Sequence, residues 1–418
     1  MSHITEQREF VRSIVRGTYD LQKLRIQSGN RITANYKNKL GIVPGKPEDE
    51  EKIATKILDD IRRDFTRITD SIALEALDDV KLPTAKKFKA EGIISTLTEL
   101  TLATQYFSFL ANEERQFKNL GRVLEDVPIY KDFLADIKGV GPQMAGVLIS
   151  EIDIYRAEYP SSLWKLSGLD VVVVGKYTDK TGVEKIVRGD IVESFYADGD
   201  YDKPLIIDGC VVELDTVGRS RKNFCLVKRE YTTKEGATAW KDSITFNPWL
   251  KTKLIGVLAG SFLKQSTMFV DGAEMGVTKR TELAKTLGFK MSTKSDVKPT
   301  KQVDIFLIEK GYDLEFIPGK YAQFYYDYKN RLDLSPFHDE KTDFHKHNMA
   351  LRFMIKRFLV DYYNKARALE GLPVALEYGE AKLGLVHGKA KGMPNYQGLI
   401  GHVMKKRYDP ALFDTPDE

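Results

Sequence analysis

The sequence predicts a mainly α-helical fold: a helical N-terminal domain, a helix-hairpin-helix element, and a small antiparallel β-insertion within a second helical region. Three observations predict it. Apolar residues recur at three- and four-residue spacing through most of residues 1–125, which is the period of an amphipathic helix. A glycine-rich turn at residues 138–142 separates two short amphipathic segments. Strand-like runs between Gly and Asp turns fill residues 171–217.

Length and composition limit the class of protein. The chain has 418 residues, of which 42% are apolar and 30% charged, so two or three domains with real cores are expected. Its two cysteines, Cys210 and Cys225, exclude a disulfide framework and indicate a reducing compartment. The N-terminus lacks the apolar core of a signal peptide, and no stretch reaches the length of a membrane span. We therefore expect a cytoplasmic protein with no membrane partner.

The first domain, residues 1–125, is predicted to contain three helices. Residues 4–40 read as the first helix, and residues 48–77 read as the second, with a stripe of isoleucines as its buried face. The third is expected to begin after Pro83 and to reach Leu124, with one break allowed. No βαβ pattern occurs here. A long helical hairpin of this kind can pair two chains, so we expect a homo-oligomer.

Residues 126–170 are predicted to open the second region with a helix-hairpin-helix. A helix over 130–137 and a second over 143–152 flank the turn at 138–142. Gly139 and Gly141 allow a sharp turn and a close approach, and the N-terminus of the second helix attracts phosphate. Gly139, Val140, Gly141 and Gln143 are therefore candidate nucleic-acid contacts. A plain αα-turn without a ligand is the alternative interpretation.

Residues 171–217 are predicted to form the acidic β-insertion, residues 218–372 the remainder of the second region, and residues 373–418 a basic C-terminal extension. Within the remainder, a β-like piece runs to Trp240, and a helix is expected from about Pro248 to Leu263. Residues 266–300 show no strong periodicity, which favours a flexible or peripheral segment.

The formal net charge of +4 hides a segregation of charge along the chain. Residues 48–79 and 191–215 each carry a net charge of −6, whereas residues 218–254 carry +6 and residues 345–407 carry +8. Clusters of Lys and Arg bind polyanions by releasing condensed counterions. The two basic blocks are thus candidate phosphate-binding surfaces, with a merely solvated face as the alternative.

The segment from Met349 to Leu369 is predicted to be one helix with two distinct faces. Its apolar residues fall within one arc, the expected core face. Arg352, Lys356, Tyr363 and Arg367 fall together on another side. A basic stripe that includes an aromatic side chain is suited to following a phosphate backbone.

Several runs occur in the order typical of a known family. They are IKGVGPQMA at residues 137–145, Glu151-Ile152, LWKLSGL at 163–169, ITFNPWLKTKL at 244–254, YAQFYYDYK at 321–329 and HNMA at 347–350. This order resembles the C-terminal domain of the bridge-RNA-guided, "one-ten" insertion-sequence transposases. The resemblance covers roughly residues 130–365, interrupted by the acidic insertion, and its first motif is the most specific.

The resemblance implies DNA and a structured guide RNA as partners, and a serine nucleophile in the Gly/Arg-rich stretch after the GL motif. Ser220 is the first candidate, and Ser243 is the second. Arg219, Arg221 and Lys222 flank Ser220 and could stabilise the charge that develops on an attacked phosphodiester. An ordinary loop serine among phosphate-binding arginines is the alternative.

The chain departs from the family in its first domain. The family carries an N-terminal RuvC-like domain whose four acidic residues hold divalent metal, but residues 1–125 read as helices. No cofactor is therefore predicted, and divalent metal is expected only with a RuvC-like partner. The pair His345 and His347 point apart at a helix start, which disfavours a metal site. The aromatic residues of 321–328 favour a core role over base stacking.

The leading hypothesis is a DNA-binding protein of the transposase type that acts in, or derives from, DNA transposition or site-specific recombination. The alternatives are a catalytically inert module that binds DNA or RNA, and an interaction protein that oligomerises through its N-terminal helices.

Overall fold

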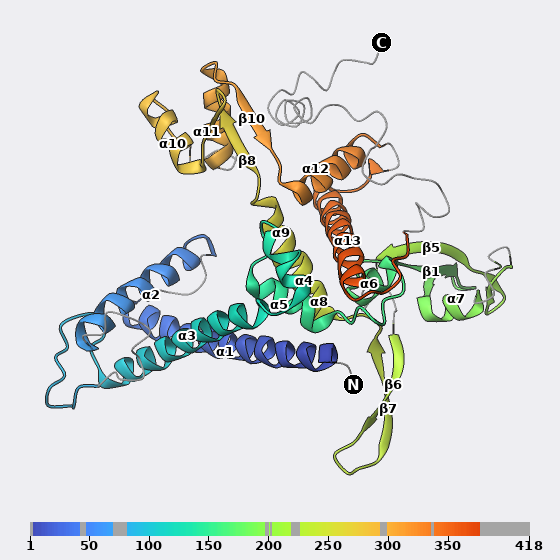
Figure 1. Cartoon of the computed structure of the whole chain (residues 1–418), viewed down its shortest axis with the longest axis horizontal. Helices are drawn as coiled ribbons and strands as arrows, with labels where there is room; N and C mark the ends of the chain where they lie inside the picture. Colours follow the sequence, from blue (N-terminus) through green and yellow to red (C-terminus); the bar gives the residue numbers. More distant parts are fainter. Residues whose placement is uncertain are drawn as a thin grey trace. The chain divides into compact units, whose positions relative to one another are not determined.

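The computed structural model describes residues 3–41, 47–69, 82–196, 200, 203–218, 226–292, 299–335 and 338–376 (Figure 1). The described part is mainly helical with small antiparallel sheets, as predicted. It divides into two compact units: the first draws on Met1–Ala135 and Gly141–Glu151, and the second on Asp136–Val140 and Ile152–Glu418. The finer domain boundaries given above remain predictions. No helix within the described ranges has the length and apolar character needed to cross a membrane.

The first unit is built from helices. They are α1 (His3–Lys39), α2 (Pro47–Thr69), α3 (Leu97–Leu124), α4 (Pro128–Lys131) and α5 (Pro142–Glu151). The first two predicted helices are confirmed, although residues 70–77 lie outside the described part. The third starts later than predicted, because residues 84–95 form turns and bends before Thr96 caps α3. No strand occurs in the described residues of 1–125.

Helices α1, α2 and α3 share one apolar core. Its fully buried members include Ile32, Tyr36, Ile61 and Phe107, and the rings of Phe65 and Phe107 lie 4.7 Å apart. These residues come from all three helices, so the amphipathic stripes read from the sequence meet as expected.

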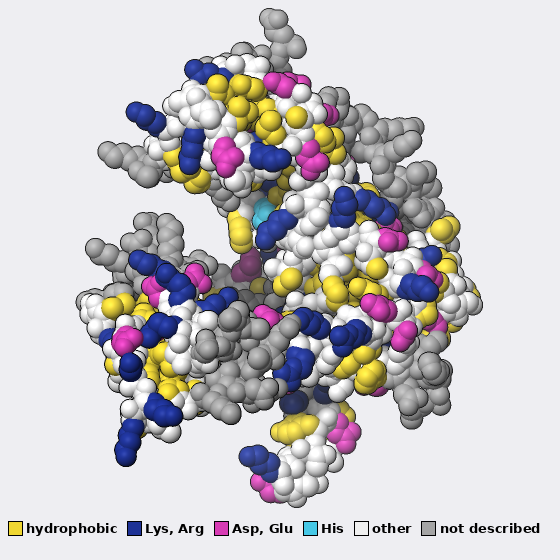
Figure 2. All heavy atoms as spheres, turned by 60° about the vertical axis from the view of Figure 1, so that its left-hand side comes forward, with side chains coloured by type: hydrophobic (Ala, Val, Ile, Leu, Met, Phe, Trp, Pro, Cys, Tyr) yellow, Lys and Arg dark blue, Asp and Glu magenta, His cyan; other side chains and the backbone are white. Residues whose placement is uncertain are grey.

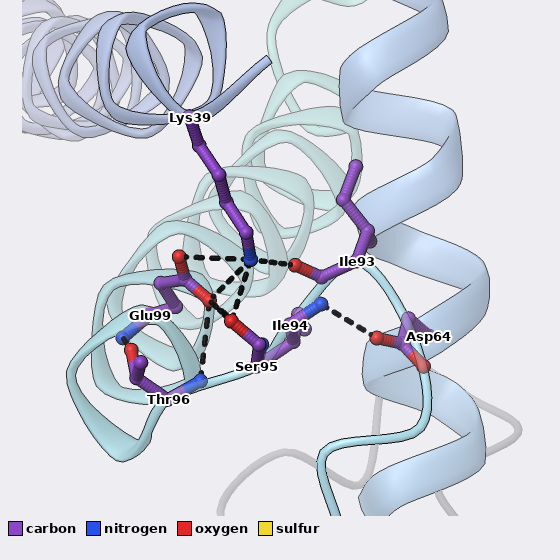
Figure 3. Close-up of polar contacts among 7 residues, drawn as sticks. All are labelled: Lys39, Asp64, Ile93, Ile94, Ser95, Thr96 and Glu99. Carbon is purple, nitrogen blue, oxygen red and sulfur yellow. Dashed lines mark hydrogen bonds and ion pairs between the residues drawn. The ribbon is translucent and has the colours of Figure 1, made fainter.

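A buried carboxylate fixes the start of α3 (Figure 3). Thr96 and Glu99 form a capping box, in which the Thr96 hydroxyl accepts from the Glu99 backbone N–H. The Glu99 carboxylate also accepts from the Ser95 backbone N–H at 2.7 Å and from Lys39 Nζ at 3.2 Å. Burial alone would raise the pKa of Glu99, but the Ser95 and Lys39 hydrogen bonds outweigh it and hold the pKa below its usual value. The end of α1 is thereby tied to the start of α3.

A second buried carboxylate ties α2 to the same segment. Asp64 accepts from the Ile94 backbone N–H at 2.8 Å (Figure 3). It also accepts from Arg67 Nη2 at 2.6 Å. A Cβ on Gly92 would lie 2.3 Å from the Asp64 carboxylate. The irregular residues 92–96 are thus held between α2 and α3, which explains why they do not continue the helix.

Replacing Glu99 by glutamine should destabilise the first unit alone. The neutral amide has one acceptor oxygen and no charge, so it cannot replace all of these hydrogen bonds. The free energy of unfolding should therefore fall by roughly 1–3 kcal/mol at neutral pH. Because the folded-state pKa is lowered, the contribution is present above the unfolded pKa of about 4.3 and disappears as the pH falls through the folded pKa. The variant and the wild type should therefore converge in acid. All three tryptophans, Trp164, Trp240 and Trp249, lie in the second unit. The unfolding transition followed by circular dichroism should therefore shift, whereas the transition followed by tryptophan fluorescence should not.

The acidic insertion forms a three-stranded antiparallel sheet in the order β2-β1-β5. The strands are β1 (Val171–Thr178), β2 (Glu184–Val187) and β5 (Glu213–Gly218), and the short pair β3 (Ile206–Ile207) and β4 (Cys210–Val211) precedes β5. The prediction of strand-like runs across residues 171–217 is partly wrong, because Gly189–Phe195 is the helix α7. Val192 and Tyr196 bury their side chains against Val187 and Val212, so tertiary packing overrides the strand-like composition.

The central part of the second unit has an aromatic core. It is formed by α8 (Pro248–Lys253), the short π-helix η3 (Leu254–Leu258), α9 (Ala259–Leu263), α12 (Lys320–Asp333) and α13 (Asp343–Leu369). The ring of Phe262 stacks on Tyr321 at 4.7 Å and meets Phe358 edge-on at 5.3 Å. The predicted helix at 248–263 is confirmed, and so is the core role of the buried Tyr321 and Tyr325.

Residues 266–292 form regular elements that were not predicted from the sequence. They include β8 (Thr267–Val270), β9 (Ala273–Glu274) and α10 (Val277–Thr286), which join α11 (Pro299–Glu309) and β10 (Leu314–Ile317) in a small α/β element with the sheet order β10-β8-β9. Residues 293–298 lie outside the described part. Arg280 and Asp304 form a buried ion pair at 2.8 Å. The pair joins α10 to α11. The sequence shows no strong apolar period here from which these helices could be predicted.

Candidate nucleic-acid interface

The turn at residues 167–170, which follows α6 (Pro160–Leu166), is the centre of the candidate site. The helix ends in a Schellman motif: the Leu169 N–H donates to the Trp164 carbonyl at 2.9 Å, and the Gly168 N–H donates to the Lys165 carbonyl at 3.1 Å. Gly168 has a φ of +64°, and the buried Ser167 hydroxyl donates to the Leu163 carbonyl at 2.6 Å. The GL motif is thus a rigid helix end.

The end of strand β7 (Thr238–Ile244) packs directly on this turn. A Cβ on Gly168 would lie 2.5 Å from the Phe246 ring, so only glycine leaves room for that ring. The Asn247 N–H donates to the Leu166 carbonyl at 2.7 Å. The Asn247 side chain caps α8 by accepting from the Leu250 N–H at 3.0 Å. The turn therefore fixes both the end of β7 and the start of α8.

Two cations of α13 lie beside the same turn. Lys356 Nζ is 3.7 Å from the Asp170 carboxylate and 4.7 Å from the centre of the Trp164 ring. Arg352 lies against Gly218 at the end of β5, because a Cβ there would be 2.5 Å from Arg352 Nη1. Burial lowers the pKa of Arg352, whose guanidinium stays charged at any physiological pH. Arg352 and Lys356, one helical turn apart, thus bring positive charge to the point where β5 ends.

Two cations of α8 are held by aromatic rings nearby. Lys251 Nζ lies 4.9 Å from the centre of the Phe246 ring, and Lys253 Nζ lies 5.7 Å from the Trp249 ring. Burial lowers the pKa of Lys253. The contact with Phe246 places Lys251 beside the ring that packs on the 167–170 turn. The sequence placed these lysines in a basic block but did not predict their contacts with aromatic rings. The alternation of aromatic and basic residues in FNPWLKTK could have indicated those contacts.

The structure describes only one of the two serine candidates. Ser220 and its neighbours Arg219, Arg221 and Lys222 lie outside the described residues. Ser243 is described: it is half-buried near the end of β7, opposite Val227 in the register. Phe246, three residues further on, packs on the 167–170 turn. The described geometry therefore places Ser243 in the segment that connects the hairpin to this turn.

The predicted stripe on α13 is wrong for two of its four residues. Tyr363 is fully buried, and its hydroxyl donates to the Glu158 carbonyl at 2.6 Å. Arg367 is 7% exposed, and its guanidinium donates to the carbonyls of Ala157, Ile154 and Pro373. The four residues do lie on one side of α13, but the chain around residues 154–158 and 373 covers the C-terminal half of that side. Arg352 and Lys356 remain as candidate nucleic-acid contacts.

The core face of α13 is confirmed over most of its length. The buried members are Leu351, Met354, Ile355, Phe358, Leu359, Tyr362 and Ala366, whereas Leu369 is only half-buried. The helix also starts earlier than the predicted segment, where Thr342 caps it by accepting from the His345 N–H at 3.3 Å.

The helix-hairpin-helix is not established by the structure. In place of a helix over 130–137 there is one turn of α4 and a 3₁₀ turn η2 (Leu134–Asp136). Gly139 has a φ of +99° and its carbonyl accepts from Ser261 Oγ at 2.8 Å. Val140 is buried, and its N–H donates to the Ile137 carbonyl at 3.0 Å.

In the first unit, Gly141 begins the next turn and is exposed. Gln143 hydrogen-bonds Tyr19 of α1, whose pKa burial raises to about 12. Packing inside each unit therefore explains Gly139, Val140 and Gln143 without a ligand, and their role as nucleic-acid contacts stays a prediction.

Metal ligands do not gather in the described part of the chain, where no group of three or more His, Cys, Asp or Glu side chains could hold an ion. His347 Nδ1 is 2.7 Å from the Tyr325 hydroxyl, so it is engaged in the aromatic core.

Comparison of the chain with protein-family models, curated proteins and solved structures finds no match.

Proposed function

We propose that the chain binds duplex DNA as a protein of the transposase type, acting in or derived from DNA transposition or site-specific recombination. The observation that carries the proposal is the gathering of Arg352, Lys356 and Lys251 around the 167–170 turn. These cations come from α8 and α13, which are far apart in the sequence, and Ser243 lies on β7 three residues before Phe246, whose ring packs on the turn. The order of motifs that resembles the transposase domain supports the same interpretation.

The chemistry proposed for the site is transesterification by a serine hydroxyl, with Ser220 as the first candidate and Ser243 as the second. Attack of the serine oxygen on a DNA phosphate forms an O–P bond and breaks the bond from phosphorus to one deoxyribose oxygen. The hydroxyl proton ends on that leaving oxygen. Fixed cations such as Arg352 stabilise the charge that develops on the phosphate. This step gives a role to Arg219, Arg221 and Lys222, which flank Ser220 in the sequence.

Removing the α13 cations should weaken DNA binding and its salt dependence. For Arg352→Ala combined with Lys356→Ala, the slope of log Kobs against log salt should fall by about 1.8, since each phosphate contact contributes roughly 0.9. Fluorescence anisotropy of a labelled duplex across a salt series measures it. The matched control removes two exposed lysines of the α10 region, Lys285 and Lys290, and should retain most of the wild-type slope. Equal losses in both variants would contradict a localised interface.

The serine step has its own test. Wild-type protein incubated with end-labelled nicked or mismatched duplex should form an adduct that survives denaturing electrophoresis. Ser220→Ala and Ser243→Ala each remove one candidate nucleophile, and the adduct should disappear in one of them. Ser194→Ala, at an exposed position of α7, should retain it. Salt-dependent binding with no adduct in the wild type would indicate a catalytically inert binding module instead.

A further inference from the structure

The hairpin of β6 (Leu226–Thr232) and β7 is exposed along most of its length. The two seven-residue strands pair from Leu226 opposite Ile244 to Thr232 opposite Thr238, with a tight turn around Gly236. It is drawn at the bottom of Figure 1, and the corresponding region of Figure 2 carries hydrophobic, basic and acidic side chains. Trp240 is 62% exposed and Tyr231 is 40% exposed. A two-stranded hairpin gains little stability from exposed aromatics, which points to a role in binding.

The two faces of the hairpin differ in charge. Directly opposed residues share a face, and the faces alternate along each strand. On one face Arg229 is opposite Lys241 and Tyr231 is opposite Ala239; Lys241 Nζ lies 5.0 Å from the centre of the Tyr231 ring, which confirms that they share it. We call this set, Arg229, Tyr231 and Lys241, the cationic face. It holds two cations and an aromatic ring and no acidic residue.

The opposite face has a net charge of −1, from Lys228, Glu230 and Asp242. There Lys228 is opposite Asp242, and Glu230 is opposite Trp240. Residues 226–244 together carry four basic and three acidic side chains, so the hairpin as a whole has a net charge of only +1. The attraction for a polyanion therefore arises from the sorting of charge between faces, which the net charge conceals.

Ser243 belongs to the same side of β7 as Lys241, two residues further along the strand. A polyanion that follows the cationic face toward the base of the hairpin thus reaches the register position of Ser243 and then the 167–170 turn. The hairpin and the cations around that turn would contact one continuous ligand.

We propose that the cationic face of the β6–β7 hairpin inserts into the major groove of duplex DNA. The proposal rests on the proposed function and names the binding element and the form of the nucleic acid. A B-DNA major groove about 12 Å wide admits a two-stranded ribbon, and seven residues of strand reach roughly 23 Å along it. Arg229 and Lys241 contact phosphates or guanine edges, and Tyr231 adds apolar contact. The deep, narrow major groove of A-form RNA does not admit such a ribbon.

The test compares two double variants of equal charge change in the full-length chain. Arg229→Ala with Lys241→Ala removes both positive charges of the cationic face. Lys228→Ala with Lys234→Ala instead removes two positive charges from the opposite face and the turn. At about 0.15 M salt the first variant should bind a 30-base-pair duplex roughly 30-fold more weakly than wild type, since each lost contact is worth about fivefold there. The second should lie within about threefold of wild type. Duplex RNA of the same length should compete poorly.

A third variant guards against misfolding of the substituted hairpin. Residues 229–241 are replaced by Asn-Gly, which closes a short hairpin between Lys228 and Asp242 with a favoured turn. It should lose at least as much affinity as the first variant, with unchanged unfolding by circular dichroism. Wild-type protein that does not bind DNA would refute the proposed function. Salt-dependent wild-type binding with equal affinities for the two double variants, undiminished affinity of the shortened hairpin, or equal competition by duplex RNA would overturn this inference alone.

Discussion

Replacing Arg367 by alanine is expected to lower the free energy of unfolding of the second unit by about 3–4 kcal/mol, because three backbone carbonyls lose a charged donor in a buried setting. Nη1 donates to the Ala157 carbonyl at 2.7 Å and to the Ile154 carbonyl at 3.2 Å, and Nε donates to the Pro373 carbonyl at 2.5 Å. One side chain thus joins α13 to the segment after α5 and to the chain beyond its own end. Urea unfolding followed by tryptophan fluorescence reports on this unit.

The comparison variant is Arg331→Ala, which removes an exposed arginine near the end of α12. Its effect should stay within about 0.5 kcal/mol, as for most surface substitutions. If Arg367→Ala were as mild as Arg331→Ala while lowering DNA affinity strongly, the guanidinium would be a nucleic-acid contact and its structural assignment would be wrong.

Replacing Gly168 by alanine should produce the second large effect. A side chain at φ +64° costs roughly 1–2 kcal/mol, and displacing the Phe246 ring costs about 1–3 kcal/mol more. The added Cβ would lie 2.5 Å from that ring. Because Phe246 connects β7 to α8, the variant should also weaken DNA binding under conditions where it remains folded. Urea unfolding and anisotropy on the same preparation measure both effects.

The same substitution at Gly256 is the control. Gly256 has no atom within 4 Å of an added Cβ and no positive φ, so alanine there should be neutral or mildly stabilising. A loss at Gly256 equal to that at Gly168 would show that the close packing of the 167–170 turn is not the cause.

Helical periodicity was the reliable part of the sequence interpretation. It predicted α1, α2, the helix at 248–263 and the core face of α13, because an amphipathic stripe reflects burial directly. It did not predict α7, where burial of Val192 and Tyr196 against neighbouring strands overrides a strand-like composition. Periodicity also did not predict the late start of α3. That start depends on Asp64, which accepts a hydrogen bond from the backbone N–H of Ile94, thirty residues later.

The candidate site was harder to predict, because a helix face does not reveal what covers it. Arg352 and Arg367 carry the same charge on the same side of α13, yet Arg367 is enclosed by chain from residues 154–157 and 373. The pairing of Lys356 with Asp170 joins residues nearly two hundred positions apart. Strand alternation could have sorted the charges of the hairpin from the sequence, but only once the register of β6 on β7 was known.

The most direct test of the account is the salt dependence of duplex DNA binding by the unmodified chain. With several cations engaged around the 167–170 turn and on the hairpin, the slope of log Kobs against log salt should be about −4 or steeper, at roughly −0.9 for each phosphate contact. A slope near zero, or no binding at low salt, would contradict the claim that these cations form a nucleic-acid interface.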